Sequence, residues 1–297
     1  MYLAVREMKR QSLRNMHLAV RYAAVGTLKY IVKTPKGRKI MAIGIITGAS
    51  SGIGAELARG IAARGVDELW LVARREERLK ALAEELGIKC KIIKADLATQ
   101  GGIDAIRTAL EETRPEVKYL VNAAGFGNFG SFDEISEGEV AQMIDLNVKA
   151  SVLITHMTVP YMVRGGRIVE LGSGSCFTPL PYFNTYAAGK SFILHYTKAL
   201  NHELKKYGVR ATCFCPGWVH TEFLGKATAS ENATRPRTNA FKPLLDCKKV
   251  VGGCLRAMDR GRAMYVTGWY TKLQHLLFKL LPDPILTRLW LGMLEKR

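Results

Sequence analysis

The sequence lacks several features that would assign it to a familiar class of proteins. Its six cysteines show no C-x-x-C spacing and its six histidines show no metal-site spacing, so no zinc or iron–sulfur site is predicted. It contains no internal repeat and no low-complexity block. No secretory signal opens the chain, which favours reduced, mostly buried thiols in an intracellular, cytoplasmic protein.

Acidic residues are scarce. The chain has 26 Asp and Glu against 44 Lys and Arg, which gives a formal net charge of +18 over 297 residues. Residues 1–40 carry ten basic residues and only Glu7 as an acid, so this segment alone contributes +9. Such a balance favours contact with an anionic partner, such as a membrane surface, a nucleic acid or a phosphorylated ligand. No nucleic-acid partner is expected, because the chain shows neither aromatic interleaving nor a recognisable module.

The basic segment 1–40 ends in a polar linker, TPKGRK (34–39), and is predicted to be an extension of the main domain. Its longest uncharged apolar run, 22–28, is far shorter than the roughly 20 residues of a membrane span. An amphipathic helix at a membrane interface fits better, and the arginine-rich composition also resembles an organelle transit peptide. A third interpretation is a start assigned upstream of the real one, because Met41 directly precedes the first predicted strand.

Residues 41–268 alternate between β-rich apolar runs and amphipathic helical stretches. Strands are expected near 42–47, 68–73, 90–95, 118–122, 166–171 and 209–215, and helices near 53–64, 75–86, 101–113, 137–163 and 185–206. Continuous apolar strands separated by helices indicate a parallel sheet covered on both faces. The predicted fold class is α/β, with a single doubly wound Rossmann domain, a mostly parallel sheet of about seven strands, and basic N-terminal and amphipathic C-terminal extensions.

Two stretches near the C-terminus differ from this pattern. The polar, irregular stretch from 217 to 243 follows the strand at 209–215 and is typical of a lid or of disorder. In the tail, 269–297, an apolar stripe at helical spacing is interrupted by Lys272 and Lys279; it consists of Leu273, Leu276, Leu277, Leu280 and Leu281. This tail is expected either to pack on the domain or on a second subunit, or to contact a membrane surface or a lipid substrate.

A glycine-rich turn, TGASSGIG (47–54), joins the first strand to the first helix. Gly48 permits a tight turn, Gly52 lets the backbone approach a ligand, and Gly54 lets the helix pack closely on the strand. The amides at the helix start would then face a pyrophosphate. The turn therefore predicts a dinucleotide site, although its G-x-x-x-G-x-G spacing differs from the common G-x-G-x-x-G.

Three motifs in this order, TGASSGIG, NAAG (122–125) and YAAGK (186–190), resemble the short-chain dehydrogenase/reductase superfamily over roughly residues 42–268. The resemblance implies a Rossmann-fold oxidoreductase that transfers hydride between a nicotinamide cofactor and a secondary alcohol or ketone. It also implies a homodimer or homotetramer. The stretch LVARREERL (71–79) and the basic, leucine-rich tail resemble a branch with lipid- and steroid-type substrates, and thus a role in lipid metabolism.

The resemblance also implies the cofactor and its contacts. An NAD-binding member has an acidic residue at the end of the second strand, where this chain has Ala73 followed by Arg74 and Arg75. A guanidinium at Arg74 favours the 2′-phosphate of NADP(H), whereas Arg75 is interpreted as a solvated arginine at a helix start. Asn122 is expected to tie neighbouring strands first and to line the cofactor second. The implied cofactor-binding residues are Gly48, Ser50, Ser51, Gly52, Ile53, Gly54, Arg74, Asp96, Leu97, Asn122, Ala123, Gly125, Tyr186, Lys190, Pro216, Gly217, Val219 and Thr221.

Tyr186 and Lys190 stand four residues apart, on one face of a helix. Ser173 precedes Tyr186 by 13 residues, the usual separation in the family, and Ser175 is a competing candidate. The resemblance makes Tyr186 the general acid/base, Ser173 a hydrogen-bond donor to the substrate oxygen, and Asn147 the holder of a water in a distorted helix. We expect the Lys190 ammonium, together with the positive charge of an oxidised nicotinamide, to favour the Tyr186 phenolate, with one such cation lowering the pKa by about two units. These four residues are the predicted catalytic set.

The predicted substrate is apolar, because six bulky side chains are expected near the site. They are Phe177, Leu180, Tyr182, Phe183, Trp218 and Phe223. These side chains could equally belong to the core. The alternative to an enzyme is a non-catalytic Rossmann-fold binding or scaffold protein at a membrane surface, for which the charge of +18 is the support.

Overall fold

The computed structural model describes residues 41–227, 235–236 and 243–295. Its centre is a seven-stranded sheet in the order β3-β2-β1-β4-β5-β6-β8, in which all neighbouring strands run parallel. The strands are β1 (Ala42–Thr47), β2 (Glu68–Ala73), β3 (Lys89–Lys94), β4 (Glu116–Asn122), β5 (Met162–Leu171), β6 (Arg210–Cys215) and β8 (Met264–Val266). The expectations for residues 1–40 fall outside the described residues.

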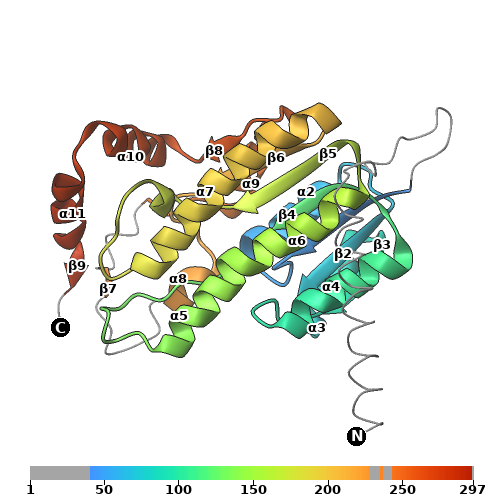
Figure 1. Cartoon of the computed structure of the whole chain (residues 1–297), viewed down its shortest axis with the longest axis horizontal. Coiled ribbons are helices and arrows are strands. Elements are labelled where there is room, and N and C mark those ends of the chain that lie inside the picture. Colours follow the sequence, from blue (N-terminus) through green and yellow to red (C-terminus); the bar gives the residue numbers. More distant parts are fainter. Residues whose placement is uncertain (1–40, 228–234, 237–242, 296–297) are drawn as a thin grey trace, which may run out of the picture.

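Helices cover both faces of this sheet (Figure 1). On one face, α4 (Gln100–Thr113), α6 (Ser151–Thr158) and α7 (Asn184–Leu204) contribute apolar side chains to a buried cluster with the strands. On the other face, α2 (Gly52–Ala62), α3 (Glu76–Leu86) and α9 (Cys247–Asp259) form a second cluster. Because helices cover the inner strands on both faces of the sheet, apolar residues in these strands do not alternate with polar ones. All six residues of β1 are buried. The predicted α/β Rossmann fold is confirmed.

One helical stretch differs from its predicted form. The helix expected over 137–163 consists of α5 (Glu137–Ile144), a π-helical segment (Asp145–Ala150) and α6, which ends at Thr158. A short 3-10 turn (Val159–Tyr161) with Pro160 at its start follows, and β5 then begins at Met162. Proline lacks the amide hydrogen that a continuing α-helix requires, which explains the earlier end.

Beyond the sheet, the chain adds two helices, α10 (Trp269–Leu280) and α11 (Asp283–Leu291). Figure 1 shows them, in red, at one end of the molecule. The helix α8 (Glu222–Ala227) lies within the stretch 217–243, expected to be a lid or disordered and here called the lid segment, and β7 (Arg235–Pro236) in the same stretch pairs antiparallel with β9 (Leu294–Glu295). The lid segment and the C-terminal end are therefore joined by strand pairing. The division of the chain into residues 1–40, 41–268 and 269–297 stays a prediction.

Candidate active site

A cleft lies at the carboxyl ends of the parallel strands, where loops from β1, β2, β3, β4, β5 and β6 meet. This edge is the usual position of a ligand site in an open α/β sheet, because successive loops diverge there. Most of the residues that the sequence singled out line this one cleft. They are Gly48, Ser50, Ser51, Gly52, Ile53, Gly54, Arg74, Asp96, Leu97, Ala123, Gly125, Ser173, Tyr186, Lys190, Pro216, Gly217, Val219 and Thr221.

The glycine-rich turn forms one end of the cleft. Gly48 has a φ of 68°, and a Cβ there would lie 2.7 Å from the amide nitrogen of Ala124, so no other residue fits without moving the backbone. The Thr47 Oγ1 accepts hydrogen bonds from the amides of Ala123 (3.2 Å) and Ala124 (3.3 Å). The turn and the loop after β4 are thus fixed against each other, and the start of α2 faces the cleft.

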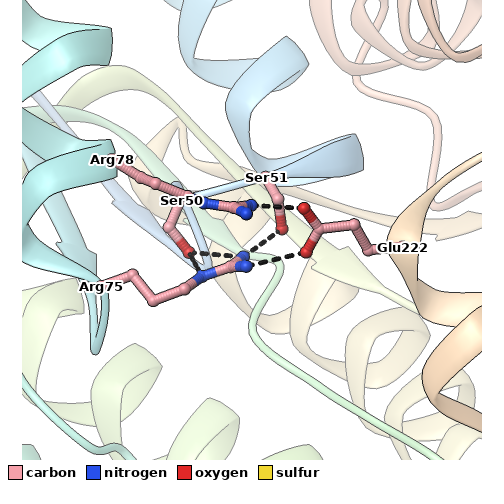
Figure 2. Close-up of polar contacts among 5 residues, drawn as sticks. All are labelled: Ser50, Ser51, Arg75, Arg78 and Glu222. Atoms are coloured by element: carbon pink, nitrogen blue, oxygen red, sulfur yellow. Dashed lines mark hydrogen bonds and ion pairs between the residues drawn. The ribbon is translucent and has the colours of Figure 1, made fainter.

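A group of charged and hydroxyl side chains surrounds this turn (Figure 2). The Arg75 guanidinium donates to Ser50 Oγ (3.2 and 3.3 Å), to Ser51 Oγ (2.6 Å) and to Glu222 Oε2 (2.8 Å). Arg78 pairs with the other carboxylate oxygen of Glu222. These hydrogen bonds lower the pKa of Glu222 to about 2. The interpretation of Arg75 as a merely solvated arginine is therefore wrong, since it joins the glycine turn to α8.

Arg74 is more exposed than Arg75. Its side chain is 70% exposed and lies 3.7 Å from Asp96 Oδ2. Asp96 itself is held by its Oδ1, which accepts from the amide of Ala98 at 3.1 Å. Arg74 and Asp96 both line the cleft, as does Arg75. This end of the cleft therefore carries two arginines, which directly follow the last residue of β2. Sequence reasoning missed Arg75 and Glu222 because their contact joins positions 147 residues apart.

Asn122 does not line the cleft. Its amide nitrogen donates to Thr155 Oγ1 (2.8 Å) and Glu170 Oε1 (2.9 Å), and its side chain is buried between β4, β5 and α6. Thr155 Oγ1 also donates to Glu170 Oε1 at 2.6 Å. The structural interpretation of Asn122 is confirmed, and its place among the cofactor-lining residues is not, because the side chain points into the interior.

The opposite end of the cleft contains Ser173, Tyr186 and Lys190. Ser173 follows β5, whereas Tyr186 and Lys190 lie one turn apart on α7. The Lys190 Nζ donates to the Leu171 carbonyl at 2.7 Å and lies 5.6 Å from the centre of the Tyr186 ring. Ser173 Oγ accepts from the amide of Ser175. Ser175 is buried and is not among the residues that line the cleft, which favours Ser173 over its competitor.

Two glycines in the loop after β4 allow this convergence. A Cβ at Gly127 would lie 2.5 Å from Tyr186 Cδ2, and one at Gly125 would lie 2.5 Å from Asn147 Oδ1 and 3.4 Å from Lys190 Nζ. Gly127 was not singled out from the sequence, although this second glycine, two residues after the end of NAAG, was an available signal. Close approach, rather than turn geometry, requires glycine at both positions.

Asn147 lies behind the cleft, in the π-helical segment between α5 and α6. Its Nδ2 donates to the Phe126 carbonyl (2.7 Å) and its Oδ1 accepts from the Phe126 amide (3.2 Å). The π-helical segment is the helix distortion that was expected at Asn147. Such π-bulges are a frequent feature of functional sites. The side chain holds the backbone of the loop that lines the cleft.

Burial controls the titration of the two ionisable groups on α7. It raises the pKa of Tyr186 above its ordinary value, and a hydrogen bond with Ser173 acts in the opposite direction. Burial also lowers the pKa of Lys190, whose side chain is 2% exposed. Desolvation therefore dominates the pKa of Tyr186 in the protein alone, and the expected lowering, which includes the charge of an oxidised nicotinamide, stays a prediction for the complex with the cofactor.

Aromatic side chains form the wall beside Tyr186. Phe183 and Phe223 lie 4.4 and 5.5 Å from the Tyr186 ring, and Phe183 stacks on Phe129. Leu180, Tyr182 and Trp218 belong to the same cluster, as the sequence predicted. Phe177 does not, because its ring packs 3.9 Å from that of His275 on α10. Sequence reasoning missed Phe126, Phe129 and Trp290, which come from loops and from α11.

Within the part of the chain that the structure describes, no group of three or more His, Cys, Asp or Glu side chains could hold a metal ion. Over the same residues, no helix is both long and apolar enough to cross a membrane. The six cysteines form no disulfide among themselves, and four of them are buried.

Comparisons with known proteins agree with this geometry. The family model described as short chain dehydrogenase matches residues 42–232, more than half of the chain. The chain is 36% identical over 195 residues to sulfoacetaldehyde reductase 2 of Chromohalobacter salexigens. The aligned region covers 64% of this chain and 77% of that protein. It is 32% identical over 186 residues to the human inactive hydroxysteroid dehydrogenase-like protein 1, covering 60% of this chain and 56% of that protein.

Among solved structures, a short-chain dehydrogenase from Sphingobium yanoikuyae in complex with NADPH is similar, with a TM-score of 0.67 and 28% identity. The similarity covers 81% of this chain and 95% of that one. Structures determined with NADH or NAD share the fold at less than 25% identity. Similarity of fold therefore supports a nicotinamide dinucleotide and does not distinguish the phosphorylated form from the other.

Proposed function

Because this chain belongs to the short-chain dehydrogenase family, whose members are oxidoreductases of alcohols and carbonyls, we propose that it is an NADP(H)-dependent carbonyl reductase with an apolar substrate. The observation that carries the proposal is the single cleft with two chemically different ends. Ser173, Tyr186 and Lys190 converge at one end, and the glycine turn lies with Arg74 and Arg75 at the other.

The residues of the cleft fit a dinucleotide. The backbone at Gly48 leaves no room for a side chain, and the start of α2 presents amides to the cleft, as a pyrophosphate requires. Arg74 and Arg75, with Ser50 and Ser51, would hold the adenosine end, and Tyr186 with Lys190 the nicotinamide end. The bound cofactor supplies the hydride for reduction of the substrate carbonyl.

The preference for NADP(H) is supported by charge. No carboxylate ends β2 to repel a phosphate, and the Arg75 guanidinium already binds an anion, the Glu222 carboxylate. A guanidinium binds phosphate and carboxylate oxygens with the same forked geometry. The ribose phosphate of NADP(H) would therefore find two arginines, Arg74 and Arg75, at the place where an NAD enzyme keeps an acid.

Tyr186 would act as the proton donor in reduction. The phenol is protonated at neutral pH, and burial, which raises its pKa, favours that form further; Ser173, which is close enough to hydrogen-bond to it, would donate to the same substrate oxygen. Lys190, fixed by the Leu171 carbonyl, lies 5.6 Å from the tyrosine ring and would stabilise the phenolate that remains. Asn147 would hold the loop at Phe126, in which Gly125 lies beside Lys190 and Gly127 beside Tyr186.

The aromatic wall supports an apolar substrate. Phe126, Trp218 and Phe223 line the cleft beside Tyr186, whereas the charged groups gather at the opposite end. A ketone with an aliphatic or ring-shaped body would bury its apolar surface there while its oxygen meets Tyr186 and Ser173.

Turnover of a panel of ketones by the purified protein, with NADPH and with NADH, tests the proposal. We expect faster reduction with NADPH and a higher kcat/KM for bulky apolar ketones than for small anionic carbonyls. Equal use of both cofactors contradicts the assigned role of the arginines, and preference for anionic carbonyls contradicts the role of the aromatic wall.

A second candidate function is a non-catalytic binding protein. The similarity to an inactive hydroxysteroid dehydrogenase-like protein favours it, together with the net charge of +18. The presence of Ser173, Tyr186 and Lys190 at one point of the cleft favours catalysis. Tight binding of NADPH, seen as a change in its fluorescence, without turnover of any ketone in the panel would support the second candidate.

A further inference from the structure

The helices α10 and α11 expose an unusual number of large apolar side chains. Of the thirteen large hydrophobic residues that are exposed in the described part of the chain, eight fall between positions 269 and 291. Trp269 is 74% exposed and Leu280 is 69% exposed. The full set is Trp269, Leu273, Leu276, Leu277, Leu280, Ile285, Leu289 and Leu291. An apolar surface of this density usually marks an interaction site.

On α10 the exposed apolar side chains form one stripe. Trp269, Leu273, Leu276 and Leu280 recur every three or four residues, which places them on the same side of the helix. The opposite side packs on the domain, since Thr271 is buried and the ring of His275 contacts Phe177. The leucine stripe is therefore not the side that this helix uses for its own packing.

The next helix, α11, is arranged in the same way. Leu286 and Trp290 are buried, and Trp290 Nε1 donates to the Pro181 carbonyl at 2.8 Å. Ile285 and Leu289 lie on the other side, with Leu289 60% exposed. Figure 1 shows both helices at the same end of the molecule. Each helix is thus fixed to the domain by one side and leaves an apolar side uncovered.

The charges around this surface are almost all positive. Lys272 and Lys279, seven residues apart, lie along one edge of the stripe on α10, which contains no acidic residue. On α11, Arg288 is exposed and Asp283 is the only acid. A second copy of the chain would bring the same cations and the same net charge of +18 to this surface. An anionic lipid surface instead supplies the opposite charge, with acyl chains for the leucines.

We propose that α10 and α11 bind the surface of an anionic lipid bilayer, with the leucine stripe inserted at the headgroup boundary and Lys272, Lys279 and Arg288 facing lipid phosphates. This binding does not depend on the proposed enzymatic activity. It places the bilayer next to the cleft, because a Cβ at Gly217 would lie 2.3 Å from Thr271 Oγ1 of α10. Trp290 also belongs to the aromatic cluster around Tyr186. The substrate, if the proposed function holds, is then a carbonyl compound that dissolves in the bilayer.

Flotation of the full chain with vesicles tests the proposal. The vesicles consist of phosphatidylcholine alone or of phosphatidylcholine mixed with phosphatidylglycerol. The test variant carries Leu276→Glu, Leu280→Glu and Leu289→Glu. The matched control carries Phe132→Glu, Gln142→Glu and Phe192→Glu, which change the net charge equally at exposed positions elsewhere. Thermal unfolding and NADPH fluorescence verify that both variants fold.

We expect the wild type and the control to float with the mixed vesicles. The affinity of the test variant for these vesicles should be lower by about 10-fold or more. Binding to phosphatidylcholine alone should be clearly weaker than to the mixture. Equal flotation of both variants overturns the proposal, as does equal binding of the wild type to the two vesicle types. Sedimentation velocity tests whether a second copy of the chain covers this surface instead. If the wild type does not float but is an oligomer, and the test variant alone is a monomer, the surface is a contact between two copies of the chain.

Discussion

The two ends of the cleft use opposite physical means. At the glycine turn, Arg75, Arg78 and Glu222 are partly exposed, and they interact through charge and hydrogen bonds that span three elements. Around Tyr186, the charged groups are few and buried, and the neighbours are aromatic. Charges near water recognise an ionic ligand and contribute little to stability. Charges out of water change their pKa values and thereby become useful for proton transfer.

If the proposed function holds, this difference lets one cleft hold an ionic cofactor and act on an uncharged carbonyl. The polar end would bind the phosphates without altering the reactive groups, and the apolar end would set the protonation of Tyr186 without contacting the phosphates. The following variants alter one end at a time.

Tyr186→Phe is expected to have the largest effect. It removes the proton donor, so kcat for ketone reduction should fall by about 10²- to 10⁴-fold, whereas the Kd of NADPH changes little. The matched control is Tyr182→Phe, which loses a hydroxyl in the same aromatic cluster but does not line the cleft. Steady-state kinetics and NADPH fluorescence titration measure the two effects. Equal loss of turnover in both variants would show that packing, rather than proton donation, is the role of Tyr186.

Glu170→Gln tests how burial of a carboxyl group behind the apolar end of the cleft affects stability. Burial raises the pKa of Glu170 from 4.5 to about 7. The folded protein then binds more protons than the unfolded chain between these pH values, so the free energy of unfolding falls as pH rises through this window. Glutamine keeps an oxygen for Thr155 and Asn122 and cannot ionise. Urea unfolding should give similar stabilities at pH 5 and, at pH 8, a variant more stable by up to about 3 kcal/mol.

A pH profile of Glu170→Gln that runs parallel to that of the wild type would contradict this account of burial. Thr155→Val serves as a second probe, because it removes a hydroxyl that donates to the Glu170 carboxylate. It should steepen the dependence on pH, since the ionised form loses a stabilising hydrogen bond.

Arg75→Gln examines the polar end. It removes a charged donor, so the KM for NADPH should rise about 10- to 100-fold while the KM for NADH changes little. Arg59→Gln is the control, because this arginine pairs with Glu56 and Glu85 away from the cleft. An equal rise for the two cofactors would assign Arg75 a structural role at Ser50 and Ser51 instead.

Glu222→Gln should have the smallest effect and the opposite sign. Its carboxylate holds Arg75 and Arg78, and would compete with the phosphate of NADPH for both guanidinium groups. The variant should therefore bind NADPH a few-fold more tightly, most clearly at low salt. Because the pKa of Glu222 is lowered to about 2, wild-type affinity should show no titration of this group between pH 5 and 8. Weaker binding in the variant would mean that Glu222 positions the arginines for the cofactor.

Local patterns predicted most of the fold and most of the positions in the cleft. The glycine turn and the spacing of Ser173, Tyr186 and Lys190 depend on short stretches of chain, so their arrangement could be expected before the structure. The seven-stranded sheet followed from apolar runs between amphipathic helices, although β8, of only three residues, was too short to be singled out.

What could not be predicted depends on contacts between distant positions. Arg75 was misjudged because Glu222 reaches it from α8, and the aromatic wall was incomplete because Trp290 arrives from α11. The rise in the pKa of Tyr186 in the protein alone was not expected, since the sequence shows the neighbouring lysine but not the burial of both groups. Periodicity shows which side chains share a helix face and not how deeply that face is buried.

Transfer of deuterium from NADPH that carries two deuterium atoms at C4 of the nicotinamide ring to a bulky apolar ketone tests the central claim most directly. The account predicts one deuterium in each product alcohol with the wild type, detected by mass spectrometry, and almost no labelled product with Tyr186→Phe although NADPH still binds. Labelled alcohol formed by Tyr186→Phe at the wild-type rate, or bound NADPH that labels no ketone in the presence of the wild type, would contradict it.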